Sequence, residues 1–257
     1  MKLTSYEELM LAYLHLLGHQ DGVTEIRILN AGIYRGRIVW RSQGIVSGYY
    51  DSDHYEKAVQ DIRPYNGTGN IYTCLNPAHP DLLARACNRL VPYSRATTGD
   101  AEIIRLNWVP IDIDPYRPSG IPATEKELAA ALARRDEAVT YLTGILGEGH
   151  HICGMSGNGG HGLIRIDLPN DAGARTLVKE IGDGLSQKFS DPHEEGVKIY
   201  DPPRVGLDNT VYNPARIWKL PGTMAIKGDS VPELDRIHRR STINICSVTP
   251  ADLGGME

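Results

Sequence analysis

The sequence contains no apolar run that approaches the ~20 residues a membrane-spanning helix requires, so we expect no membrane partner. It has four cysteines and no Cys-x-x-Cys pair, which argues against a zinc ribbon. We find no signal peptide, and scattered cysteines without one also argue against a disulfide framework. We therefore expect a cytoplasmic protein of a reducing compartment, without zinc. A weaker alternative groups Cys74, Cys87 and His79 around a zinc ion.

A net positive charge is also missing, because 32 Asp and Glu residues outnumber 27 Lys and Arg residues and give a net charge of −5. No global positive field is therefore available to attract nucleic acid. This argues only mildly against a DNA-processing role, since a polymerase gathers acidic residues at its metal site and basic residues along a local groove. The stretch from Arg216 to Arg240 is locally basic. Phenylalanine is nearly absent, with one Phe against 13 Tyr, so tyrosine carries the aromatic load.

Turn residues and hydrophobic periodicity divide the chain into helices and short strands. Helices are predicted at residues 5–18, 53–65, 80–90, 124–146 and 170–189, and the first and fourth begin with capping boxes. Strands are predicted at residues 24–30, 36–41, 44–50, 70–75, 103–115, 151–154, 163–166, 197–200, 216–219 and 224–227. Residues 191–213 form a long irregular connection of a kind that is often functional. Helices alternating with strands and tight turns predict a mixed α/β (α+β) fold.

Asp112 and Asp114 end the apolar stretch at residues 103–115, which predicts a buried strand. Alternate side chains of a strand share a face, so both carboxylates point the same way while Ile111 and Ile113 point into the core. Two like charges this close repel each other unless a cation lies between them. Oxygen ligands that converge on one point suit Mg²⁺ or Mn²⁺. The alternative is a strand end whose aspartates cap the turn before Pro115.

A glycine-rich turn at residues 156–161 lies between two strand-like runs. Glycines let the backbone approach phosphate oxygens closely, and turn amides can form an anion-binding concavity. The turn lacks the Lys-Ser/Thr pair of a Walker A loop. A plain hairpin, with His161 satisfied in the core, is the alternative.

Asp208 follows a polar loop, and basic residues follow it on a short strand. The alternative for Asp208 is a turn residue beside Asn209, since Asp-Asn is a common turn pair. Arg216 and Lys219 precede a tight turn and Lys227 follows it, and here the alternative is a solvated strand face.

In this order, the segments resemble the catalytic domain of the archaeo-eukaryotic primase superfamily, specifically the primase-polymerases of plasmids, phages and other mobile elements. That family carries an Asp-x-Asp or Asp-x-Glu motif, then small-x-His, then a lone Asp. The matching residues are Asp112 and Asp114, then Gly159-Gly160-His161, then Asp208. The stretch at residues 213–223 resembles the segment after the third motif in bacterial and phage members. The resemblance covers roughly residues 20–245.

The resemblance implies a catalytic unit at residues 101–245 with an RRM-like mixed sheet that carries the metal site. This unit would pack against an N-terminal α/β unit at residues 1–100 to form one module with a cleft. Residues 246–257 would be a C-terminal tail or linker.

The implied activity is that of a nucleotidyltransferase, a DNA primase and DNA polymerase that uses dNTP or NTP substrates, single-stranded DNA template and primer, and two divalent ions. Asp112 and Asp114 would hold both ions, and Asp208 would complete the site of the attacking hydroxyl. His161 would donate a hydrogen bond to a β- or γ-phosphate oxygen. The nucleotide-binding residues would be Ser156, Gly157, Asn158, Gly159, Gly160, His161, Arg216, Lys219 and Lys227.

Arg236, Arg239 and Arg240 are weaker candidates for tracking the template backbone, since surface basic runs often serve solubility alone. Many family members add a helicase domain, so a helicase domain or protein is a possible partner. Two other classes of function stay open. One is a replication-initiator nuclease, and the other is a non-catalytic module that binds single-stranded nucleic acid.

Overall fold

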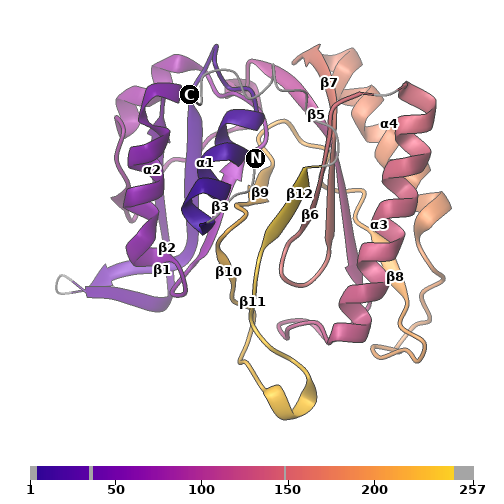
Figure 1. Cartoon of the computed structure of the whole chain (residues 1–257). Coiled ribbons are helices and arrows are strands. Elements are labelled where there is room, and N and C mark those ends of the chain that lie inside the picture. Colours follow the sequence, from indigo (N-terminus) through magenta and orange to yellow (C-terminus); the bar gives the residue numbers. More distant parts are fainter. Residues whose placement is uncertain (1–4, 35–36, 148, 246–257) are drawn as a thin grey trace.

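A computed structural model describes residues 5–34, 37–147 and 149–245 of the chain (Figure 1). In these residues, strands form two five-stranded antiparallel sheets and one small two-stranded sheet. The predicted mixed α/β class is confirmed. No helix in the described part of the chain is long and apolar enough to cross a membrane.

The first sheet has the order β4-β2-β1-β3-β9. Four of its strands come from the first hundred residues, and the fifth returns from much later in the chain. The helices α1 and α2 accompany it, and α1 begins with the predicted Ser5 capping box. The elements are α1 (Tyr6–Leu16), β1 (Thr24–Tyr34), β2 (Arg37–Tyr50), α2 (Tyr55–Ile62), β3 (Asn70–Cys74), β4 (Val91–Pro92) and β9 (Ile217–Lys219).

The second sheet has the order β12-β6-β7-β5-β8, and its helices α3 and α4 lie on the face turned away from the first sheet (Figure 1). The chain order β5-α3-β6-β7-α4-β8 and the spatial order β6-β7-β5-β8 are those of an RRM-like split β-α-β unit, with β12 added beside β6. The elements are β5 (Arg105–Pro115), α3 (Glu125–Leu146), β6 (His151–Met155), β7 (Gly160–Pro169), α4 (Ala172–Phe189), β8 (Val205–Leu207) and β12 (Thr242–Ile245).

Period-two alternation along β5 separates its two faces. Val109, Ile111 and Ile113 belong to one buried cluster with residues of α3 and α4. Trp108, on the opposite face, belongs to a second cluster together with Ile152 and Leu163 of the second sheet and buried residues of the first sheet, α1 and α2. The second cluster therefore packs the two sheets against each other.

A small sheet of β10 (Met224–Ala225) and β11 (Arg239–Arg240) joins the two larger sheets, and the chain between these strands loops out below them (Figure 1). Arg236 binds Glu127 through both terminal guanidinium nitrogens, at 2.9 and 3.0 Å. Arg239 donates to Glu125 at 2.8 Å, and the Glu125 backbone N–H donates to Asp235. The loop is thus tied to the start of α3.

Four of the predicted elements differ in kind or in connection from the observed ones. The predicted helix at 80–90 is a 3₁₀ helix, Pro80–Arg85, because the chain then turns to exchange hydrogen bonds with Tyr49: Ala86 accepts from it and Asn88 donates to it. The two predicted strands at 36–41 and 44–50 belong to one strand, β2, which pairs with β1 at residues 37–40 and 45–50, on both sides of a register shift. The predicted strand at 197–200 is irregular, with its neighbouring loop residues held by side-chain contacts. The predicted tail, 246–257, lies outside the described residues.

Candidate active site

A cleft with a volume of about 430 Å³ opens between the two sheets and the segment after β10. Its walls come from six separate stretches of sequence. The residues that line it are Asn30, Asn70, Tyr72, Asp112, Asp114, Arg117, Ser156, Asn158, His161, Lys219, Ala225, Ile226, Lys227 and Gly228.

Asp112 and Asp114 lie on the cleft side of β5, while Ile111 and Ile113 pack in the core on the other side. Their side chains keep 23% and 48% of their surface exposed, so both carboxylates are accessible from the cleft. The strand alternation expected from the sequence thus produces a paired carboxylate face.

The pKa of Asp114 is raised. The main cause is the protein that surrounds it and displaces water, and the charge of Asp112 adds to the effect. The positive charges of Arg117, Lys227 and His161 act in the opposite direction. A divalent cation between the carboxylates would relieve both the repulsion and the desolvation, so the pair fits such an ion.

His161 pairs directly with Asp112 across the β5–β7 ladder. Its Nε2 lies 3.3 Å from Asp112 Oδ1, and its ring packs on Trp218 of β9 with centroids 4.1 Å apart. An aromatic residue of the first sheet therefore supports the imidazole beside the carboxylates of the second.

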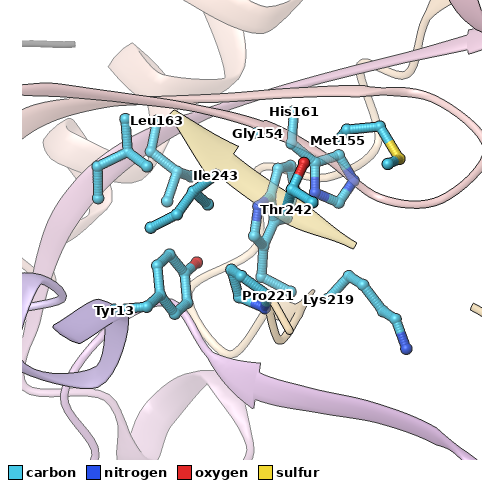
Figure 2. Close-up of a pocket in the computed structure, with 11 residues that line it drawn as sticks. Tyr13, Gly154, Met155, His161, Leu163, Lys219, Pro221, Thr242 and Ile243 are labelled. Carbon is cyan, nitrogen blue, oxygen red and sulfur yellow. The ribbon is translucent and has the colours of Figure 1, made fainter. Parts of the chain in front are cut away.

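Beside His161 lies a small cavity of about 10 Å³ that is also lined by Tyr13 of α1 (Figure 2). His161 and Lys219 line both the cavity and the cleft. Figure 2 shows Tyr13 on the opposite side of the cavity from Lys219. The Tyr13 hydroxyl is buried and has no hydrogen-bond partner among the described residues. Helix α1 therefore lies across this cavity from His161 and Lys219.

The glycine turn before β7 is held by its own hydrogen bonds. Ser156 Oγ accepts from the backbone N–H groups of Asn158 and Gly159, at 3.3 and 3.0 Å, and the Gly157 N–H donates to Met155 Sδ. Asn158 Oδ1 accepts from Ala123 N–H at 2.8 Å. These three amides do not form the anion-binding concavity predicted from the glycines, because partners within the turn already use them. Ser156 and Asn158 nevertheless line the cleft.

At two positions of this turn only glycine fits, because the backbone of a neighbouring element lies too close for a side chain. A Cβ on Gly159 would lie 2.5 Å from the Ile113 carbonyl oxygen and against the Asp114 carboxylate. A Cβ on Gly160 would lie 2.9 Å from the Ala131 carbonyl oxygen of α3. The turn can therefore sit directly against the carboxylate strand only without side chains at these positions.

Asp208 lies beside Asp112 in the sheet, since its backbone N–H donates to the Asp112 carbonyl oxygen at 2.9 Å. Its carboxylate is exposed, accepts from the backbone N–H and hydroxyl of Thr210, and is not among the groups that line the cleft. This is the turn arrangement considered as the alternative. In the part of the chain that the structure describes, no three His, Cys, Asp or Glu side chains converge as a metal-binding group.

The zinc alternative is not supported either, because its residues do not converge. Cys74 is fully buried against Glu25, at 3.5 Å, whereas Cys87 is exposed. His79 caps its own 3₁₀ helix by accepting from Asp81 N–H.

Lys219 is a buried cation of the cleft, with 5% of its surface exposed. Its Nζ donates to the Met224 carbonyl oxygen at 2.7 Å and lies over the Tyr72 ring, 5.5 Å from the centroid. Burial lowers the pKa of Lys219 to about 7. Lys227, on the segment after β10, also lines the cleft.

Arg216 does not reach the cleft, contrary to prediction. It precedes β9, and its guanidinium group turns back to the Thr210 carbonyl oxygen at 2.6 Å. The three arginines proposed for the template backbone also have partners: Arg236 and Arg239 pair with α3, and Arg240 donates to the Gly222 carbonyl oxygen at 2.7 Å.

Arg117 and Tyr72 line the cleft but were not among the predicted site residues. Arg117 Nη1 lies 3.5 Å from Asp114 Oδ1, and its position three residues after Asp114 was an available signal. Burial raises the pKa of Tyr72, and the charges of Asp112 and Asp114 raise it further. Tyr72 lies opposite Lys219 in the β3–β9 ladder, and no local sequence motif indicates that pairing.

No family model matches the chain, and no curated protein matches it. A solved structure titled "Crystal structure of primase RepB'" is similar to the chain, at 9% sequence identity and a TM-score of 0.44. The match covers 93% of this chain and 56% of that one, so this chain spans little more than half the length of its structural neighbour.

Proposed function

We propose that this protein is a metal-dependent nucleotidyltransferase that makes DNA primers and extends them on a single-stranded template. The observation that carries the proposal is the cleft face of β5, where Asp112 and Asp114 stand side by side and His161 faces Asp112 from the neighbouring strand. The sequence order of these residues is that of the primase family they resemble.

Asp112 and Asp114 would hold the divalent ions, and Asp208 would join them if its carboxylate left Thr210. The ions would supply stabilisation of the attacking and leaving oxygens in transfer to an α-phosphate. The raised pKa of Asp114 favours this assignment, since the two carboxylates repel each other and a cation between them would remove that repulsion.

The cations of the cleft are suited to a triphosphate. Lys219 and Lys227 come from the two sides of the β9–β10 turn, and Arg117 adds a guanidinium group next to Asp114. A buried ammonium and a guanidinium group are fixed donors for phosphate oxygens. His161, held between Asp112 and the Trp218 ring, would donate a hydrogen bond to the same anion.

The direct experiment measures nucleotide incorporation on single-stranded DNA with Mg²⁺ or Mn²⁺, with and without a primer. We expect product in both reactions for the wild type and loss of product for Asp112→Asn/Asp114→Asn. Asp167→Asn/Asp183→Asn is the matched control, because those exposed carboxylates lie outside the cleft and pair with Arg105 and Lys179.

Extension only from a supplied primer would restrict the proposal to a polymerase. Template cleavage without nucleotides would replace it with a nuclease. Template binding without synthesis or cleavage would replace it with a binding module.

A further inference from the structure

A second pocket, of about 420 Å³, lies between α1, α2 and the end of β11, and it is nearly as large as the cleft. None of the described residues that line it also lines the cleft. Its apolar part consists of Met10 of α1 and of Val59 and Ile62 of α2, all of which are buried. Sites for small molecules typically measure roughly 300–1,000 Å³, so the pocket has the size of a ligand site. We call it the α1–α2 pocket.

The charged residues of the α1–α2 pocket are Arg63, Arg240 and Glu7. Arg63 binds the Glu7 carboxylate through Nε at 2.5 Å and through Nη2 at 2.6 Å. Arg240 is half-buried and donates to the Gly222 carbonyl oxygen at 2.7 Å, and it has no carboxylate partner among the described residues. Because charges withdrawn from water are normally paired, the Arg240 guanidinium group is suited to an anion brought by a ligand.

An aromatic ring lies beside this cation. The Arg240 guanidinium carbon is 4.1 Å from the centroid of the Tyr6 ring, and such a contact attracts the cation to the ring. Tyr6 is nevertheless 55% exposed, so part of its ring is open to a planar group. An aromatic ring combined with arginine is typical of surfaces that take up nucleobases.

The α1–α2 pocket is connected to the cleft by the β9–β10 turn. Asn66, on the pocket side, accepts from the Met224 backbone N–H at 2.9 Å. Lys219, on the cleft side, receives its acceptor from the same residue, since its Nζ donates to the Met224 carbonyl oxygen at 2.7 Å. Arg240 holds Gly222 of this turn. A ligand in the pocket would therefore be separate from the reacting nucleotide and would contact residues that hold the turn beside Lys219.

We propose that the α1–α2 pocket is a second binding site for a nucleoside phosphate. The phosphates would lie against Arg240 and Arg63, and the base would stack on the exposed part of Tyr6. The sugar would lie over the buried apolar residues of α1 and α2. This site goes beyond the proposed function, because a ligand held there lies outside the cleft and does not react.

The test is a calorimetric titration of the full chain with dATP and Ca²⁺, without template. We expect two binding sites per chain for the wild type. Tyr6→Ala/Arg240→Gln should weaken one of them at least about tenfold, because it removes both the stacking ring and the unpaired cation. Lys219→Met/Lys227→Met should weaken the other, because those cations line the cleft.

Tyr141→Ala/Lys188→Gln is the matched control. Lys188 Nζ lies over the Tyr141 ring, 4.7 Å from its centroid, so this variant removes a similar pair of cation and tyrosine from α3 and α4. Both residues lie outside the two pockets, and both binding sites should persist. Thermal melting checks that all variants remain folded.

Three results would overturn the inference. The first is a single wild-type site that is lost in Lys219→Met/Lys227→Met. The second is unchanged binding at both sites in Tyr6→Ala/Arg240→Gln. The third is a site that binds inorganic tripolyphosphate as tightly as dATP, because such a site recognises an anion without a nucleoside.

The titration measures binding and not synthesis, so it separates this inference from the proposed function. Two sites with the expected losses, but no synthesis by the wild type, would refute the polymerase and keep the second site. Active synthesis with one site, lost together with the cleft lysines, would do the reverse.

Discussion

Replacing Lys219 by Met should make the protein more stable and less active. Lys219 is 5% exposed, and burial lowers its pKa from 10.5 to about 7. This lowering of the pKa corresponds to roughly 5 kcal/mol that opposes folding. The full amount applies below pH 7, where Lys219 is charged in both the folded and the unfolded chain. Methionine keeps most of the aliphatic stem and loses the hydrogen bond to the Met224 carbonyl oxygen, which is worth about 1 kcal/mol. We expect a net stabilisation of about 2–4 kcal/mol at pH 6.

The difference in the free energy of unfolding between the Lys219→Met variant and the wild type should depend on pH. Between pH 7 and 10.5 the unfolded chain binds the Lys219 proton and the folded protein does not, so this group makes wild-type stability rise with pH across that window. The variant should lack this rise, and its advantage should disappear near pH 10. Urea unfolding at several pH values measures the effect, with Lys198→Met, at an exposed loop position, as the control.

The same substitution should weaken nucleotide binding although it stabilises the fold. A triphosphate in the cleft favours the charged ammonium, so Lys219→Met should raise the KM for nucleotide at least tenfold. The reasoning is refuted if the variant is destabilised equally at pH 6 and pH 10, or if its KM for nucleotide matches that of the wild type.

Three further predictions follow from the site. Asp112→Asn should abolish nucleotide incorporation while raising the melting temperature of the metal-free protein, because the repulsion on Asp114 is removed. Gly159→Ala should destabilise the protein by about 1–3 kcal/mol in urea unfolding and reduce activity, because its Cβ meets the β5 backbone. Gly184→Ala, in open space on α4, should instead stabilise by about 0.5–1 kcal/mol. Glu127→Gln should cost about 3 kcal/mol in the same assay, since it leaves a largely buried arginine without its charge partner.

The alternation of carboxylate and isoleucine along β5 could be predicted from the sequence because it depends on strand geometry alone. Both capping boxes were predictable for the same reason, since their hydrogen bonds join residues three apart. The local pattern thus placed Asp112 and Asp114 on one face without knowledge of any other element.

Contacts between distant segments were not predictable in this way. Arg216 and Lys219 looked equivalent on one short strand, yet only Lys219 lines the cleft, because Arg216 precedes the strand and turns back to Thr210. Tyr72 enters the site through a ladder with residues almost 150 positions later. Arg236 was read as a surface cation because its partner, Glu127, lies on another element.

The return of β9 to the first sheet has a consequence for how the protein is made. Strand β3 is complete at Cys74, but its ladder partner, β9, ends at Lys219. At a translation rate of ~5–20 residues per second, roughly 7–30 s separate the emergence of the two strands from the ribosome. Throughout that interval β3 has an open edge of the kind that invites pairing with other chains. The nascent chain also lacks Lys219 opposite Tyr72, so a truncated product would have neither a closed first sheet nor a complete cleft.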